Sequence, residues 1–147
     1  MQSKKLHKLE NELKGHPKIK NLIEFINNFF KLYSAEFIIL FGSSAKREFN
    51  YRSDLDLLIV TNSLKENFFE RLYQMQVINP GGIDFFIYTM SEFEYMVENF
   101  HLIALEALSD GMIIYDSGKG LFFKNYIKDL INQNKIQKFE RSWKINK

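Results

Sequence analysis

Ten residues separate a Gly-Ser pair from an Asp-x-Asp pair in the middle of the chain, within the string ILFGSSAKREFNYRSDLDLLIV. Asp54 and Asp56 stand at i and i+2 in front of an apolar run, so in a strand both carboxylates point to the same face. Like charges side by side on a buried strand repel each other unless a cation lies between them. Because Mg²⁺ takes one or two protein carboxylates together with substrate phosphates, the pair predicts a magnesium site.

The Gly42-Ser43 pair predicts a phosphate site beside these carboxylates. It ends an apolar strand, and we expect a short helix or helical turn to begin there. Helix N-termini offer free N–H groups and the positive end of a dipole to phosphate. The Ser43 hydroxyl and the backbone N–H groups around Ser44 would hold the β- and γ-phosphates of a nucleoside triphosphate. Lys46 and Arg52 are the nearest cations, for secondary contacts.

A third carboxylate, Asp84, lies in the apolar string GIDFFIY. A lone buried aspartate is costly, so we expect it to have a partner. If its strand pairs beside the strand of Asp54 and Asp56, the three acids complete a site for two Mg²⁺ ions, and Asp84 can accept a proton from an attacking hydroxyl. Taken singly, each feature has an ordinary alternative: a turn, a strand-opening aspartate, or an ion pair. Their combination favours chemistry on a triphosphate.

The elements that must position these residues follow from apolar periodicity and turn signals. Ser63 with Glu66, and Ser91 with Glu94, are the expected N-caps and capping-box partners. Strands and helices alternate, which predicts an α/β (α+β) fold with a small mixed sheet of about four strands flanked by helices. The expected helices are 3–13, 17–33, a short one at 43–49, 63–76, 91–108 and 119–132, and the expected strands are 35–41, 54–61, 83–88 and 112–115.

Length and composition bound the class of protein. With 147 residues, 46% hydrophobic and 26% charged, the chain suits one globular domain rather than a disordered one. The absence of cysteine excludes a disulfide scaffold, thiolate zinc and a cysteine nucleophile. No apolar run approaches the ~20 residues of a membrane span and no signal-peptide core is present, so we expect a cytoplasmic protein. The expected parts of this single domain are N-terminal helices (3–33), a catalytic core (35–90) and a C-terminal helical part (91–147).

Basic residues gather at the two ends of the chain, although the formal net charge is only +2. We interpret them as solvated helix faces, with nucleic acid or an acidic partner as the alternative. Phe139 and Trp143 stand at i and i+4, which favours a packed helix over a platform for stacking RNA bases. Phe122, Tyr126 and Leu130 form an apolar stripe that we expect to pack, across a homo-oligomer or against a helical partner. His16 and His101 are assigned no role.

Residues 35–90 resemble the nucleotidyltransferase superfamily that includes DNA polymerase beta, and in particular its small stand-alone prokaryotic members. The superfamily signature hG-S-x(10)-D-x-D-h with a later aspartate is matched by Gly42-Ser43, Asp54-Leu55-Asp56 and Asp84. The resemblance implies that Gly42 and Ser43 contact nucleotide phosphates and that the three aspartates bind metal. One departure is Arg47, which stands in GSSAKR where many minimal members have glycine, and it affects the shape of the loop rather than the acids.

By this resemblance the chain is a Mg²⁺-dependent enzyme that moves a nucleoside monophosphate, AMP from ATP by preference, to an acceptor hydroxyl and releases pyrophosphate. Minimal members are often antitoxins that adenylylate a helical HEPN-type toxin, so a tyrosine of such a partner is the favoured acceptor. The alternatives are transfer to a small molecule or an RNA end, and a non-catalytic antitoxin module that binds a nucleotide or a partner. The intact acids argue against the last of these.

Overall fold

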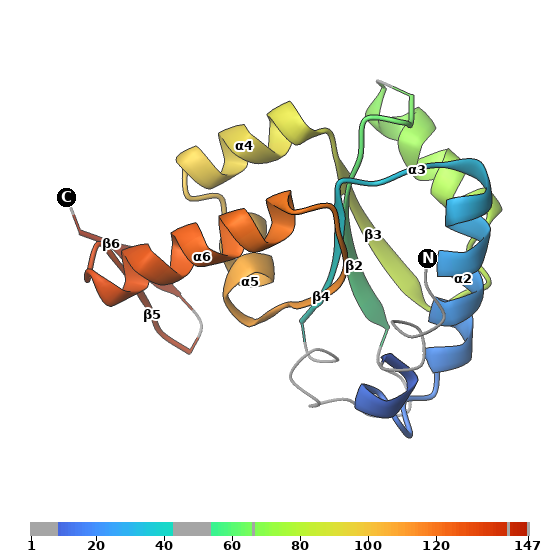
Figure 1. The fold of residues 1–147 in the computed structure, drawn as a ribbon, viewed down its shortest axis with the longest axis horizontal. Helices are drawn as coiled ribbons and strands as arrows, with labels where there is room; N and C mark the ends of the chain where they lie inside the picture. The colour runs from blue at the N-terminus through green and yellow to red at the C-terminus, as the bar shows by residue number, and fades with distance from the viewer. Residues whose placement is uncertain (1–8, 43–53, 66, 141, 147) are drawn as a thin grey trace.

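The computed structural model describes residues 9–42, 54–65, 67–140 and 142–146, and its centre is a four-stranded sheet in the order β3-β2-β1-β4 (Figure 1). The pair β2 and β3 is parallel, whereas β1 is antiparallel to both of its neighbours. The predicted α/β fold with a small mixed sheet is therefore confirmed. The strands are β1 (Phe37–Phe41), β2 (Leu55–Val60), β3 (Ile83–Tyr88) and β4 (Met112–Asp116).

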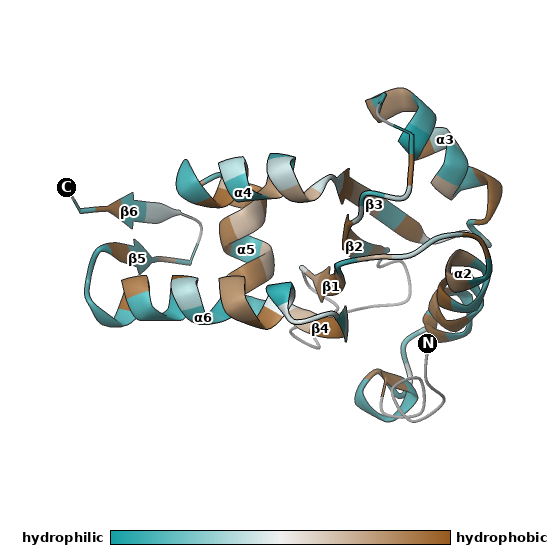
Figure 2. Ribbon diagram, turned by 45° about the horizontal axis from the view of Figure 1, so that its top comes forward, coloured by the Kyte–Doolittle hydropathy of each residue, from teal (hydrophilic) through white to brown (hydrophobic). Residues whose placement is uncertain are grey.

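Helices cover both faces of the sheet (Figure 1). One face packs against α2 (Ile19–Leu32), whose apolar side turns toward the strands (Figure 2). The same face packs against α3 (Phe68–Val77), which contributes Met75 to this core. The other face packs against α4 (Met90–Glu98), α5 (Leu102–Asp110) and α6 (Lys119–Asn132). These elements bury two hydrophobic cores, one on each side of the sheet.

The alternation of side chains along β2 decides where its carboxylate lies. Leu55, Leu57 and Ile59 enter the core under α2 and α3. Leu58 and Val60 enter the core under α4, α5 and α6. Asp56 is two residues before Leu58, so its side chain points to the same face of the sheet, the one covered by α4, α5 and α6, near the start of the strand.

The C-terminal segment differs from the prediction. Residues 135–147 were expected to be helical, but the structure has a two-stranded antiparallel hairpin of β5 (Ile136–Lys138) and β6 (Trp143–Ile145). Helix α6 ends before Asn134, whose φ of 58° turns the chain out of the helical direction. The Trp143 indole Nε1 donates to the Glu106 carboxylate at 2.9 Å, which fastens the hairpin to α5. The predicted helical pair of Phe139 and Trp143 is therefore wrong.

Two predicted N-caps are also wrong. Helix α3 begins after Asn67, whose side chain accepts hydrogen bonds from two backbone N–H groups of the first turn, whereas the Ser63 hydroxyl donates to the Ser34 carbonyl. Helix α4 is capped by Thr89 with Glu92 as the capping-box partner, instead of by Ser91. The buried Arg71 side chain of α3 also donates a hydrogen bond to the Glu92 carboxylate. This contact comes from another helix, so no local sequence pattern predicts it.

The long helix expected over 91–108 is two helices, α4 and α5. The chain turns between them at Phe100, which has a φ of 53°. The His101 side chain then caps α5 by accepting from the Ile103 N–H at 3.3 Å. Of the predicted helix 3–13, residues 9–12 are helical, and the predicted helix 43–49 lies outside the described residues. Among the helices of the described residues, none has both the length and the apolarity of a membrane span.

Candidate functional site

Asp56 and Asp84 are brought together by the parallel pairing of β2 and β3. They are register partners, so their Cα atoms face each other across neighbouring strands and their side chains lie on the same face. Asp84 is exposed, because β3 forms an edge of the sheet. The expectation of a buried Asp84 is thus wrong, whereas the expected pairing of its strand with the strand of Asp56 is observed.

Asp56 is half-buried and carries the perturbed carboxyl of the site. Its pKa is raised from the ordinary 3.8 to about 6, first by burial, then by the charge of Asp84 and then by that of Asp54. Phe41 is its register partner on β1, and the Phe41 and Phe86 rings meet edge to face with centroids 5.2 Å apart. An apolar wall on one side and carboxylates on the other therefore both disfavour the ionised form of Asp56.

Gly42 lies directly against the Asp56 carboxylate. Its φ of +78° falls in the left-handed region, where a side chain is strained. A Cβ at this position would also collide with Asp56 Oδ2 and lie 3.4 Å from its Cγ. The turn after β1 therefore requires glycine for two reasons, and its backbone lies directly against the Asp56 carboxylate.

Asp54 precedes β2 and is exposed, and its Oδ1 accepts a hydrogen bond from the Lys18 ammonium. This ion pair joins the residue before α2 to the residue before β2. Sequence reasoning did not include Lys18 in the site. Its only sequence signal is a lysine just after Pro17 at a helix start, which does not indicate a partner 36 residues away.

The donor set suits Mg²⁺ in its chemistry. Within the part of the chain that the structure describes, no group of three or more potential ligands is assembled tightly enough to hold a metal ion. Mg²⁺ needs only one or two protein carboxylates when phosphates and water supply the remaining oxygens. The paired Asp56 and Asp84 meet that need, and their mutual repulsion is what a divalent cation would relieve.

The remaining predicted nucleotide contacts, Ser43, Ser44, Lys46 and Arg52, lie outside the described residues, as does Arg47. The geometry thus concerns Gly42 and the three aspartates. His16, which was assigned no role, is buried and its Nδ1 accepts a hydrogen bond from the Lys18 backbone N–H at 3.0 Å. Burial, and next the charge of Lys18, lowers its pKa.

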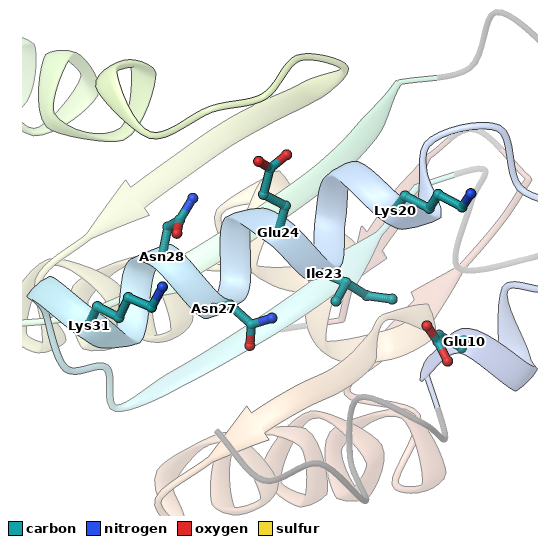
Figure 3. Close-up of a pocket in the computed structure, with 7 residues that line it drawn as sticks. All are labelled: Glu10, Lys20, Ile23, Glu24, Asn27, Asn28 and Lys31. Atoms are coloured by element: carbon teal, nitrogen blue, oxygen red, sulfur yellow. The ribbon is translucent and has the colours of Figure 1, made fainter.

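A separate hollow runs along the outer face of α2 and has a volume of about 390 Å³. None of the three aspartates lines it, and its lysine, glutamate and asparagine side chains point in several directions (Figure 3). It therefore does not belong to the acidic cluster. Its lining residues are Glu10, Lys20, Ile23, Glu24, Asn27, Asn28 and Lys31.

Comparison with known proteins identifies the family of the chain. A family model described as "Polymerase beta, Nucleotidyltransferase" matches residues 24–129, which include Gly42 and all three aspartates. No curated protein matches the sequence significantly.

Several solved structures are similar in fold. A chain from a structure of a toxin–antitoxin with AMP-PNP has a TM-score of 0.51 at 12% identity, over 78% of this chain and 90% of that one. A nucleotidyltransferase structure from Sulfolobus solfataricus has a TM-score of 0.45 at 19% identity, over 80% and 88%. A chain from the tri-AMPylated Shewanella oneidensis HEPN toxin in complex with MNT antitoxin has a TM-score of 0.45 at 12% identity, over 78% and 89%.

Proposed function

The chain belongs to the polymerase beta nucleotidyltransferase family, and we propose that it transfers a nucleoside monophosphate, AMP from ATP, to an acceptor hydroxyl. The observation that carries this proposal is the acidic pair Asp56 and Asp84, placed at register positions on parallel strands beside the Gly42 turn. A structural sheet gains nothing from two facing carboxylates, since like charges directly opposite each other are destabilising. Two facing carboxylates are complementary in charge to a divalent cation, and such a cation would also bind the triphosphate.

The nucleotide would be held by the turn after β1. The absence of a side chain at Gly42 lets the Asp56 carboxylate pack directly against this turn, so a phosphate bound by the turn would lie next to a metal ion held by Asp56. Ser43 and Ser44, with Lys46 and Arg52, are the proposed further contacts to the phosphates. Asp54, Asp56 and Asp84 would hold Mg²⁺, two ions by preference, which when bound neutralises charge on the triphosphate and on the leaving pyrophosphate.

In the proposed reaction, the acceptor oxygen attacks the α-phosphorus of ATP. A new O–P bond forms to the acceptor, the bond between the α-phosphorus and the bridging oxygen breaks, and pyrophosphate leaves with the bonding electrons. The hydroxyl proton passes to the Asp84 carboxylate. Asp84 is suited to this step because it is exposed at the sheet edge, where an acceptor can reach it, whereas Asp56 is partly covered by Phe41.

The acceptor we favour is a tyrosine hydroxyl of a helical HEPN-type partner. The resemblance to minimal nucleotidyltransferases implies this, and the fold likeness to a chain of a toxin–antitoxin structure with AMP-PNP supports it. Phe122 and Tyr126, on the exposed side of α6, are available for contact with a partner or with a second copy of this chain. Transfer to a small molecule or to an RNA end, and binding without transfer, are the other outcomes that the experiment below distinguishes.

The test is a pair of radiolabelled ATP incubations with Mg²⁺ and a co-purified partner. Label from the α-phosphate should appear on the partner, and label from the γ-phosphate should not. Asp56→Asn should abolish the transfer, and Glu94→Gln, which changes an exposed acid on α4, should leave it unchanged. Label on RNA or on a small molecule would redirect the acceptor assignment. Transfer of the γ-phosphate, or no transfer to any of these acceptors, would refute the proposed reaction.

A further inference from the structure

Lys18 lies outside the family signature and is in direct contact with one of its aspartates. Its Nζ donates to Asp54 Oδ1, although 36 positions separate the two residues. The lysine side chain is 21% exposed and the aspartate side chain 48%. An ammonium that is more buried than its carboxylate partner is held in place by its surroundings rather than by chance contact at the surface.

The path of the Lys18 side chain depends on a glycine. A Cβ at Gly82 would collide with Lys18 Cδ and would lie 2.9 Å from its Cε. The φ of Gly82 is +77°, so a side chain would also strain the backbone there. The aliphatic stem of Lys18 therefore crosses the chain at the one residue type that leaves room for it.

The same glycine turn holds both ends of the contact. The Gly82 carbonyl accepts from the Leu55 N–H at 2.9 Å, next to Asp54. The Gly81 carbonyl accepts from Asn21 Nδ2 of helix α2 at 3.0 Å. Helix α2 and the start of β2 are thus fixed to one turn, which sets Lys18 opposite Asp54.

The charges show what this contact does for the acidic cluster. The Asp54 charge contributes to the raised pKa of Asp56, so the two carboxylates repel each other. A lysine on Asp54 offsets part of that repulsion. It also occupies Asp54 Oδ1, one of the two oxygens that a metal ion could use.

We propose that Lys18 and the metal ion compete for Asp54: Lys18 is the counter-ion of Asp54 in the metal-free protein and surrenders that carboxylate when the metal binds. This rests on the proposed function, because it takes Asp54 as a metal ligand. Because the two events are linked, the free energy by which the Lys18–Asp54 contact stabilises the metal-free protein is subtracted from the free energy of metal binding. Lys18 therefore acts through Asp54 and lowers the affinity of the site for divalent ions.

The competition fixes the sign of a mutational effect. If Lys18 competes with the metal, Lys18→Met tightens Mn²⁺ binding. If Lys18 instead orients Asp54 for the metal, the same change weakens binding, because an oriented ligand loses its support. A tightening on the order of tenfold is expected, since a unit charge and a divalent ion about 6 Å apart in water interact by roughly that factor.

The experiment measures Mn²⁺ binding by electron paramagnetic resonance for the wild type, Lys18→Met and two controls. Lys20→Met removes the same charge from the same helix but faces the separate hollow on the outer side of α2 (Figure 3), so its Mn²⁺ affinity should stay within about twofold of wild type. Lys18→Arg keeps the charge and should also bind Mn²⁺ like the wild type. In EDTA, the loss of melting temperature caused by Lys18→Met should disappear in an Asp54→Asn background, which identifies the partner.

Unchanged or weaker Mn²⁺ binding by Lys18→Met would overturn the competition. So would a destabilisation in EDTA that persists in the Asp54→Asn background. A wild type that binds no Mn²⁺ at a site sensitive to Asp56→Asn would refute the proposed function itself. The two failures are therefore distinguishable.

Discussion

Replacement of Asp56 by asparagine should stabilise the metal-free protein. Asp56 is the carboxyl whose ionised form the fold disfavours, since burial, Asp84 and Asp54 together raise its pKa to about 6. Asparagine has nearly the same shape and carries no charge, so it removes the repulsion and keeps the packing against Phe41. A residue that improves binding of a cation at the expense of stability is expected at a functional site.

The magnitude follows from the pKa. The difference between about 6 and the ordinary 3.8 corresponds to about 3 kcal/mol, at about 1.4 kcal/mol per pKa unit. Asp56 is only half-buried, and solvent screening reduces this to roughly 1–2 kcal/mol. With a urea m-value of about 2 kcal/mol/M, the unfolding midpoint of Asp56→Asn should rise by roughly 0.5–1 M.

The sign of the pH dependence is fixed as well. Because the pKa of Asp56 is raised in the folded state, folding favours the protonated form, and the penalty is absent below the ordinary pKa of 3.8 and fully present above about 6. The gain from Asp56→Asn should therefore be largest at pH 7 and above, and should shrink as the pH falls toward 4. Asp129→Asn, on the exposed side of α6, is the matched control for the Asp-to-Asn change itself.

Urea unfolding in EDTA at several pH values between 4 and 8 measures this directly. A loss of stability in Asp56→Asn at neutral pH would refute the electrostatic reasoning. A gain of the same size at pH 4 and pH 8 would also refute it, since the gain would then come from packing rather than from charge.

Three further perturbations have defined outcomes. Mg²⁺ with ATP should raise the melting temperature of the wild type and not of Asp56→Asn, and a saturating ligand at about 100 times its Kd stabilises by about 2.7 kcal/mol. Gly42→Ala should lower the free energy of unfolding by roughly 1–3 kcal/mol through its left-handed φ, and should abolish nucleotide binding in calorimetry because its Cβ meets Asp56. Arg71→Met should cost roughly 2–3 kcal/mol in urea unfolding, because the buried guanidinium makes a two-pronged contact with Glu92. That contact lowers the pKa of Glu92, so the cost should be present above pH 4.5 and should decline in more acidic solution.

The helices and strands that could be predicted are those whose own sequence contains a clear pattern of apolar residues. The alternation of apolar runs and helical periods placed the four strands and helix α6, and the apolar flanks of Asp56 and Asp84 placed these two acids on strands. The pairing of β3 beside β2 was stated as a condition without a direction, and the structure has this pairing in the parallel sense. Composition alone could not predict the pairing and register of β2 and β3, because both depend on how the helix between the two strands packs.

The parts that sequence reasoning missed depend on contacts between distant residues. Ser63 has the signature of an N-cap, but its hydroxyl is bound to Ser34 of another loop, and Asn67 caps the helix instead. Trp143 looked helical because of its spacing from Phe139, yet its indole is bound to Glu106 of α5. In both cases a hydrogen bond to another element overrides a local preference.

The acidic site shows the same division. The types and spacing of the aspartates predicted a shared site, and the pairing of β2 with β3 brings Asp56 and Asp84 together. The exposure of Asp84 follows from β3 being an edge strand, which no local pattern reveals. Lys18 was missed because its contact with Asp54 exists only when α2 and β2 meet at the Gly82 turn.

The central claim is that Asp56 and Asp84 hold a divalent ion against a triphosphate that lies at the Gly42 turn. The most direct test is a crystal structure with Mn²⁺ and an ATP analogue whose α–β bridge is methylene, since that analogue cannot release pyrophosphate. The account predicts an anomalous Mn²⁺ peak at about 2.0–2.2 Å from carboxylate oxygens of both aspartates, with the phosphates against the backbone at Gly42. Manganese bound elsewhere, or a nucleotide seated away from this turn, would contradict it.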